Sequence, residues 1–165
     1  MPLVVLGLGS NLGDAHRDSR RIVLEAIKAL AEFITELRCA SLYETEPMYV
    51  TDQGRFINTA ISGHFSGSPR ELLDRINSIE GQFGRDRSSE QRWGARLLDI
   101  DILLFGELIM NEPDLIIPHP RLKERRFALQ PLLELLPDAK EPGSGLSYEN
   151  ICRALPDQGV NSIIL

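Results

Sequence analysis

Two segments, SPRELLDRINSIEGQF at residues 68–83 and LDIDILLF at residues 98–105, decide the fold of this sequence. The first segment predicts a helix, because Ser68 is a preferred N-cap residue, Pro69 suits the first helical position and Glu71 can complete a capping box. The second segment predicts a strand, because it is short, apolar and rich in residues that favour β-structure. Together they form the second half of a pattern of strands and helices that begins near residue 2.

The chain before residue 68 contains the first half of this pattern. Residues 2–9 are typical of a buried strand, and Asp14 is expected to cap the helix that follows. Residues 34–45 and 56–65 are rich in β-formers and predict two more strands. The order βαββαβ predicts an α+β, ferredoxin-like fold, in which an antiparallel sheet carries both helices on one face and leaves the other face open.

The chain beyond Gly106 gives weaker signals. A short strand, a helix, a second short helix and a last strand are expected at residues 108–110, 127–136, 148–155 and 160–165. Pro131 opposes a helix that begins well before it, because proline disfavours helix interiors. There is no internal repeat and no sign of a domain boundary, so residues 1–165 are expected to form a single domain with a C-terminal extension.

The composition excludes several classes of function. The chain of 165 residues has 18 Lys+Arg against 24 Asp+Glu, a formal net charge of −6. This charge repels nucleic acid and anionic membranes, so a phosphate site requires a local basic cluster. The apolar segment 3–8 is far shorter than the ~20 residues of a membrane-spanning helix. Cys39 and Cys152 have neither disulfide-framework nor zinc-site spacing. We therefore expect a cytoplasmic, monomeric protein without nucleic-acid or membrane partners.

Asp99 and Asp101 are the most informative pair of residues in the sequence. Residues two apart in a strand point to the same face at a spacing of about 7 Å, so these carboxylates repel each other unless a cation compensates. Carboxylates and water suit Mg²⁺, especially where substrate phosphates complete its coordination. The alternative is that both side chains face solvent, as is common in one-sided sheets. The opposite face of this strand is expected to carry Leu98, Ile100, Ile102 and Leu104.

Two basic clusters flank this strand. Residues 85–96 contain four arginines and two acidic residues, and residues 121–126 contain four cations and one anion directly after Pro118-His119-Pro120. Guanidinium groups are planar, bidentate partners for phosphate oxygens, so the two clusters predict a polyphosphate site beside the aspartates. The alternative is that both are solvated, charged loops.

Two further motifs have both a functional and a structural interpretation. The glycines between Gly7 and Gly13 have one residue too many for a dinucleotide fingerprint and lack the lysine of a P-loop, so a tight turn is favoured. Phe56 and Asn58 share one face of a strand and offer a ring and an amide to a flat heterocycle. A core phenylalanine beside a structural asparagine is an equally weighted alternative.

The segment RWGARLLDIDIL at residues 92–103 closely resembles the signature of the 6-hydroxymethyl-7,8-dihydropterin pyrophosphokinases of folate biosynthesis. Further matches follow in the order of that family, at Gly9-Ser10-Asn11, Tyr43-Glu44-Thr45-Glu46-Pro47, Phe56-Ile57-Asn58, Gly84-Arg85-Asp86-Arg87, Pro118-His119-Pro120, Arg125 and Phe127. The resemblance implies a ferredoxin-like fold and the transfer of pyrophosphate from MgATP to the hydroxymethyl oxygen of the pterin, with release of AMP.

The resemblance also implies a role for each matching residue. Asp99 and Asp101 are expected to hold two Mg²⁺ ions and to form the catalytic group with Arg85 and Arg92. The nucleotide is expected to contact Arg87, Trp93, Arg96, Ile102, His119 and Arg125. The pterin is expected to contact Thr45, Pro47, Met48, Asn58 and the rings of Phe56 and Phe127, which would sandwich it. Residues 85–96 would act as a lid that closes over the bound substrates.

Two alternatives come from other classes of function. One is an RNA-binding module that uses the open face of the sheet, and the other is a small-ligand sensor. RNA-recognition domains place aromatic residues on their central strands, whereas residues 98–105 place carboxylates there, which repel phosphate in the absence of metal. Formation of AMP from ATP in the presence of Mg²⁺ and the pterin distinguishes the three hypotheses.

Overall fold

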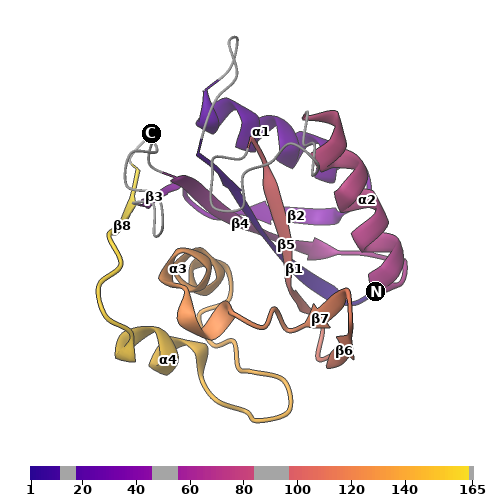
Figure 1. Cartoon of the computed structure of the whole chain (residues 1–165). Helices are drawn as coiled ribbons and strands as arrows, with labels where there is room; N and C mark the ends of the chain where they lie inside the picture. The colour runs from indigo at the N-terminus through magenta and orange to yellow at the C-terminus, as the bar shows by residue number, and fades with distance from the viewer. Residues whose placement is uncertain (12–17, 46–55, 84–96, 164–165) are drawn as a thin grey trace.

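The computed structural model describes residues 1–11, 18–45, 56–83 and 97–163 (Figure 1). Within these ranges the elements follow in the order β1 (Leu3–Ser10), α1 (Ser19–Leu30), β2 (Thr35–Cys39), β3 (Tyr43–Thr45), β4 (Phe56–His64), α2 (Pro69–Gln82), β5 (Asp99–Phe105), β6 (Met110–Glu112), β7 (Leu115–Ile117), the 3₁₀ helix η1 (Leu122–Glu124), α3 (Arg126–Leu135), α4 (Tyr148–Ala154) and β8 (Val160–Ser162).

The main sheet confirms the predicted α+β, ferredoxin-like arrangement. Its strands are antiparallel in the order β5-β1-β4-β3-β8, and β2 pairs with the other end of β4. The single strand expected at residues 34–45 is wrong, because β2 and β3 are separate. The carbonyl oxygens of Ala40 and Ser41 lie 3.1 and 3.0 Å from the Thr59 hydroxyl, which donates to this part of the backbone where the ladder is interrupted.

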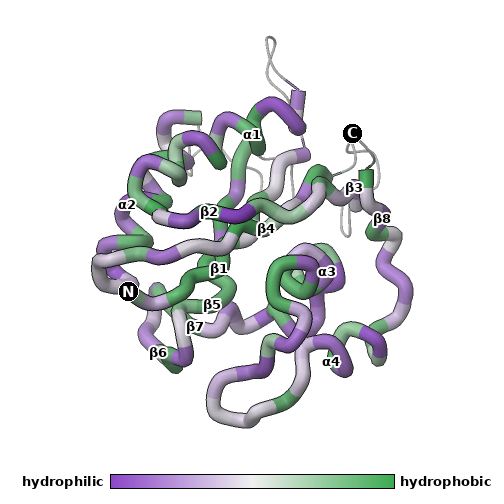
Figure 2. Tube along the Cα trace, turned by 180° about the vertical axis from the view of Figure 1, so that it is seen from behind, coloured by the Kyte–Doolittle hydropathy of each residue, from purple (hydrophilic) through white to green (hydrophobic). Residues whose placement is uncertain are grey.

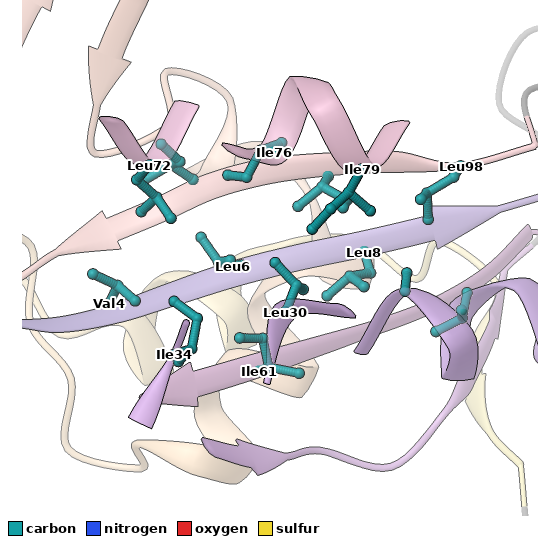
Figure 3. Packing of buried hydrophobic residues seen from close by; sticks show 14 of the residues in the cluster. Val4, Leu6, Leu8, Leu30, Ile34, Ile61, Leu72, Ile76, Ile79 and Leu98 are labelled. Carbon is teal, nitrogen blue, oxygen red and sulfur yellow. The ribbon is translucent and has the colours of Figure 1, made fainter. Parts of the chain in front are cut away.

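Helices α1 and α2 cover one face of the sheet, as predicted (Figure 1). The Ser68 hydroxyl accepts a hydrogen bond from the backbone N–H of Glu71, which confirms the predicted start of α2. The expected cap of α1 is wrong, because Asp18 and not Asp14 precedes the first helical turn and accepts from the N–H of Arg21 at 2.8 Å. Figure 3 shows the core between helices and sheet, formed by side chains that include Val4, Leu6, Leu8, Leu30, Ile34, Ile61, Leu72, Ile76, Ile79 and Leu98.

The second face of the sheet is not open as expected, because α3 packs across it and α4 packs against α3 (Figure 1). The spacing of apolar residues in α3 builds a second hydrophobic core, and Figure 2 shows hydrophobic residues on both β1 and α3. Its buried members include Val5, Ala60, Leu103 and Leu104 of the sheet, Leu129, Leu132 and Leu135 of α3, and Tyr148 and Cys152 of α4. Asp99 and Asn58 lie on this second face, where both pair with Gly9 of β1, and this part of the face carries the candidate site.

A β-bulge in β5 explains one further difference from the expected pattern. Leu6 of β1 pairs with Ile102 and Val5 pairs with Leu104, so Leu103 is an extra residue without a partner in β1. The bulge reverses the alternation of side chains, and Leu104 therefore packs under α3 instead of sharing a face with Ile100 and Ile102.

The remaining elements modify the predicted C-terminal part. The strand expected at residues 108–110 is instead a hairpin of β6 and β7, while α3, α4 and β8 begin within one residue of the predicted starts. Pro131 lies inside α3, on its buried side. Among the helices that the structure describes, none has the length and apolar character that a membrane crossing requires.

Candidate active site

Strand β5 places Asp99 and Asp101 on the second face of the sheet. Ile100 and Ile102 are buried in the core under α1 and α2, whereas the two aspartates are only partly buried, with 34% of the Asp101 side chain exposed. The alternation of a strand therefore points both carboxylates to the same side, beside the edge of α3. The interpretation that they are ordinary solvent-facing residues is less consistent with the histidine and arginines described below.

Two glycines of β1 form the floor of the site. Gly9 pairs with Asp99 on one side and with Asn58 on the other, and Gly7 pairs with Asp101 and with Ala60. A Cβ atom on Gly9 would lie only 2.7 Å from the Oδ1 atom of Asn58. The tight turn favoured for these glycines is wrong for Gly7 and Gly9, because both lie inside β1, where the lack of side chains leaves space between the carboxylates and the amide, while Gly13 lies outside the described residues.

Asn58, Thr45 and Phe56 form the side of the site opposite the aspartates. Asn58 is 6% exposed and donates from Nδ2 to the hydroxyl oxygen of Thr45 at 2.9 Å, while Thr45 is 2% exposed and pairs with Phe56 across β3 and β4. This hydrogen bond fixes the carboxamide, so Oδ1 points over Gly9. Phe56 is partly exposed and belongs to neither hydrophobic core among the described residues, so its ring is available to a ligand.

The segment between β7 and η1 brings His119 to the aspartates. The backbone N–H of His119 donates to the carbonyl of Leu103 at 3.1 Å, and its Nε2 atom lies 3.8 Å from Oδ1 of Asp101. The Nδ1 atom accepts from the N–H of Arg121 at 3.2 Å, so a neutral imidazole carries its proton on Nε2, the nitrogen that faces the site.

Burial and nearby charge keep this imidazole neutral. Burial and the positive charges of Arg125 and Arg121 together lower the pKa of His119 to about 4, although the negative charge of Asp99 opposes them. Above that pH, His119 is therefore a neutral hydrogen-bond donor toward the carboxylate side of the site.

The start of α3 contributes Arg125 and Phe127. The guanidinium carbon of Arg125 lies 5.4 Å from the centre of the Phe127 ring, which is within the range of a cation–π contact. The Phe127 ring is partly buried against the second core. One end of α3 therefore supplies both a cation and an aromatic surface.

Glu80 is a residue of the site region that the sequence interpretation missed. It is 3% exposed near the end of α2, and its Oε2 atom accepts from the N–H of Ile100 at 2.9 Å, between the two aspartates. A signal was present, because Glu80 follows Ile76 by four residues and therefore lies on the apolar side of the helix. A carboxylate on that side indicates a specific hydrogen-bonding role.

The other predicted site residues divide into two groups. Ile102 is described, but its side chain is 5% exposed in the core under the helices, so only its backbone can reach a ligand. The predicted contact of Ile102 with the nucleotide therefore stays a prediction. The remaining predicted residues, and the proposed lid, lie outside the described residues: Pro47, Met48, Arg85, Arg87, Arg92, Trp93 and Arg96.

The donor set of the site fits a magnesium ion that is completed by ligands from a substrate. Asp99 and Asp101 supply hard carboxylate oxygens from adjacent positions on one face. In the described ranges there is no group of three or more His, Cys, Asp or Glu side chains that could hold a metal. Mg²⁺ commonly binds through one or two carboxylates, with water and substrate phosphates as its other ligands, so two aspartates are sufficient.

Comparisons with known proteins agree with this geometry. The model of the family "7,8-dihydro-6-hydroxymethylpterin-pyrophosphokinase (HPPK)" matches residues 5–137. A 2-amino-4-hydroxy-6-hydroxymethyldihydropteridine pyrophosphokinase of Pseudomonas aeruginosa is 38% identical over 161 residues, which cover 97% of this chain and 96% of that protein. The protein of the same name from Bacillus subtilis is 41% identical over 133 residues, which cover 81% of this chain and 77% of that protein.

Longer proteins also resemble this chain. A folate synthesis bifunctional protein of Arabidopsis thaliana is 43% identical over 134 residues, and the chain spans only 27% of its length. A crystal structure of an HPPK-DHPS in complex with substrates has a TM-score of 0.70 at 15% identity, covering 93% of this chain and 43% of the other. The structural likeness supports the fold, while the sequence likeness supports the family.

Proposed function

Because the chain belongs to the 7,8-dihydro-6-hydroxymethylpterin-pyrophosphokinase family of folate synthesis, we propose that it transfers the pyrophosphoryl group of ATP to the hydroxymethyl oxygen of 6-hydroxymethyl-7,8-dihydropterin. The products are AMP and the pterin diphosphate. The observation that carries this proposal is that Asp99, Asp101 and Asn58 lie on one face of the sheet across the two glycines of β1.

The aspartates and His119 form the nucleotide side of this proposal. Asp99 and Asp101 would hold Mg²⁺ with the ATP phosphates, and the bound metal would supply charge neutralisation at the phosphoryl group. His119 presents an Nε2–H and Arg125 a guanidinium, and both are donors suited to phosphate oxygens. Catalysis would then depend mainly on positioning and on charge stabilisation, as is general for phosphoryl transfer. One of the two aspartates would accept the proton of the substrate hydroxyl. Alternatively, a bound metal would lower the pKa of that hydroxyl enough for it to ionise.

Asn58, Thr45 and the aromatic rings form the pterin side. The Asn58 carboxamide is already held by Thr45, so its orientation is set before a ligand arrives. A preorganised amide can recognise the donor and acceptor edge of a pterin without the entropic cost of ordering a side chain. The rings of Phe56 and Phe127 offer stacking surfaces, and the loop residues Pro47 and Met48 would complete the pocket.

The RNA-binding alternative is not favoured, because α3 covers much of the sheet face that such a module would use.

We further propose that residues 1–165 form one domain that acts as a cytoplasmic monomer. Arg85, Arg87, Arg92, Trp93 and Arg96 would bind the triphosphate or close over it.

The direct test is to incubate the chain with ATP, Mg²⁺ and 6-hydroxymethyl-7,8-dihydropterin and to measure AMP and pterin diphosphate by chromatography. We expect AMP to form only when the pterin is present. Asp99→Ala or Asp101→Ala should each reduce kcat by about 100-fold or more, as the loss of transition-state charge stabilisation does elsewhere. Asp138→Ala is the matched control, because Asp138 is an exposed carboxylate in the loop after α3. Near-normal turnover in both active-site variants, or AMP formation without pterin, would contradict the proposal.

A further inference from the structure

The C-terminal part of the chain holds together two sides of the candidate site. The family match ends at residue 137, and α4 and β8 follow it. α4 packs on α3, and β8 returns to pair with β3 at the edge of the main sheet (Figure 1). This segment therefore contacts both the helix that carries Phe127 and the strand that carries Thr45.

Gln158 replaces a local cap at the start of α3. Arg125 occupies the N-cap position, but its side chain makes no capping hydrogen bond. Instead, Oε1 of Gln158 accepts from the backbone N–H of Arg126 at 2.9 Å, and its Nε2 donates to the carbonyl of Glu124 at 2.9 Å. The carboxamide of Gln158 thus bonds to the backbone of Glu124 and Arg126, on both sides of Arg125. Arg126 is also the residue directly before Phe127.

The side chain of Arg126 strengthens the same connection. Its Nε donates to the carbonyl of Pro156 at 2.7 Å, and its Nη2 donates to the carbonyl of Leu155, the residue that follows α4, at 2.5 Å. Arg126 therefore points toward the C-terminal segment, while its neighbours Arg125 and Phe127 form the cation–π pair. The direction of these neighbours depends on how firmly Arg126 is held.

Two residues after Gln158, the chain reaches the opposite side of the site. Val160 pairs with Thr45 in the β8–β3 ladder, and Thr45 accepts the hydrogen bond that fixes Asn58. The stretch from Gln158 to Val160 thus spans from the start of α3 to the strand that orients the pterin-binding amide.

We propose that Gln158 is a positioning residue of the pterin site, which sets the start of α3 and, through β8, the spacing between Phe127 and the Asn58–Thr45 pair. The inference rests on the proposed function for the identity of the ligand. It assigns to residues beyond the family match a role that affects pterin affinity more than ATP binding, because Asp99, Asp101 and His119 are held by β5 and by the carbonyl of Leu103, and on the nucleotide side only Arg125 adjoins the residues that Gln158 holds.

The test compares steady-state kinetics of Gln158→Ala and Gln158→Glu in the full chain. The alanine variant should raise the KM for the pterin by about threefold to thirtyfold, the range expected for the loss of a helix N-cap, with a smaller increase in the KM for ATP through Arg125. The glutamate variant retains the acceptor for Arg126 but loses the donor to Glu124, so its KM should lie between wild type and the alanine variant. Arg153→Ala is the control, because it removes only the exposed ion pair with Glu149 on α4.

A second readout separates failure of this inference from failure of the proposed function. Hydrogen exchange of the amides at residues 43–45 and 125–127 should be faster in Gln158→Ala than in wild type and Arg153→Ala. If wild type makes no AMP from the pterin, the proposed function fails, whereas the exchange data still test the connection. An unchanged pterin KM with unchanged exchange, or equal increases in both KM values, would overturn the positioning role.

Discussion

Replacing Gly9 by alanine tests whether the floor of the site must lack side chains. The new Cβ would lie 2.7 Å from Oδ1 of Asn58, well inside the ordinary contact range of 3.4–4 Å. Asn58 cannot move away freely, because its Nδ2 donates to Thr45 at 2.9 Å and both residues are buried. The substitution should therefore rotate the carboxamide and break this hydrogen bond.

The expected magnitude follows from the burial of that pair. A buried polar group left without its partner costs about 1 to 3 kcal/mol, which corresponds to a factor of about 5 to 150 in an equilibrium constant. Gly9→Ala should lower the free energy of unfolding by this amount. It should also weaken pterin binding at least about fivefold, because the amide no longer has its preset orientation.

A double-mutant cycle isolates the clash from other effects. In an Asn58→Ala background there is no Oδ1 atom to displace, so the destabilisation by Gly9→Ala should largely disappear when urea unfolding is measured for all four proteins. Gly7→Ala is the control on the same strand and face, since its Cβ would meet the flexible side chain of Leu103 at 3.3 Å. A full Gly9→Ala penalty in the Asn58→Ala background would refute the reasoning.

Three further predictions concern other parts of the molecule. Phe127→Ala should weaken pterin binding by about 1 to 3 kcal/mol through lost burial, with ATP binding little changed, as measured by calorimetry with each ligand. Gly81→Ala should raise the free energy of unfolding by about 0.5 to 1 kcal/mol, because this helical position is open and alanine favours helix; a lower Tm would contradict it. Glu134→Gln should destabilise the chain at neutral pH, since burial raises the pKa of this carboxyl but hydrogen bonds from Tyr43 and Ser41 outweigh burial and hold the pKa below its ordinary 4.5. That stabilisation is present above pH 4.5 and is lost as the pH falls toward the folded-state pKa, so the two proteins should converge in acid when unfolding is followed across pH.

The sequence predicted the features that depend on local signals. The start of α2 follows from Ser68, Pro69 and Glu71 alone, and the direction of Asp99 and Asp101 follows from strand alternation. The site partners Asn58 and His119 were also identified, but from the family resemblance more than from spacing. Which atoms each of them contacts required the structure.

The features that the sequence did not predict depend on distant parts of the chain. The separation of β2 from β3 involves the Thr59 hydroxyl, which comes from another strand. The cover of the second face by α3 and the capping of that helix by Gln158 both join residues more than 30 positions apart. No local pattern of residues encodes such contacts, because their energy exists only after the chain has folded.

The β-bulge at Leu103 allows one short strand to meet two requirements that a regular strand could not combine. The part of β5 that carries Asp99 and Asp101 must point its aliphatic residues toward α1 and α2, whereas Leu104 must point toward α3. The extra residue reverses the alternation of side chains between these two halves of β5. Changes in the C-terminal core can therefore accumulate without rotating the carboxylates, whereas deletion of Leu103 would force the strand to satisfy either the active site or the α3 core, but not both.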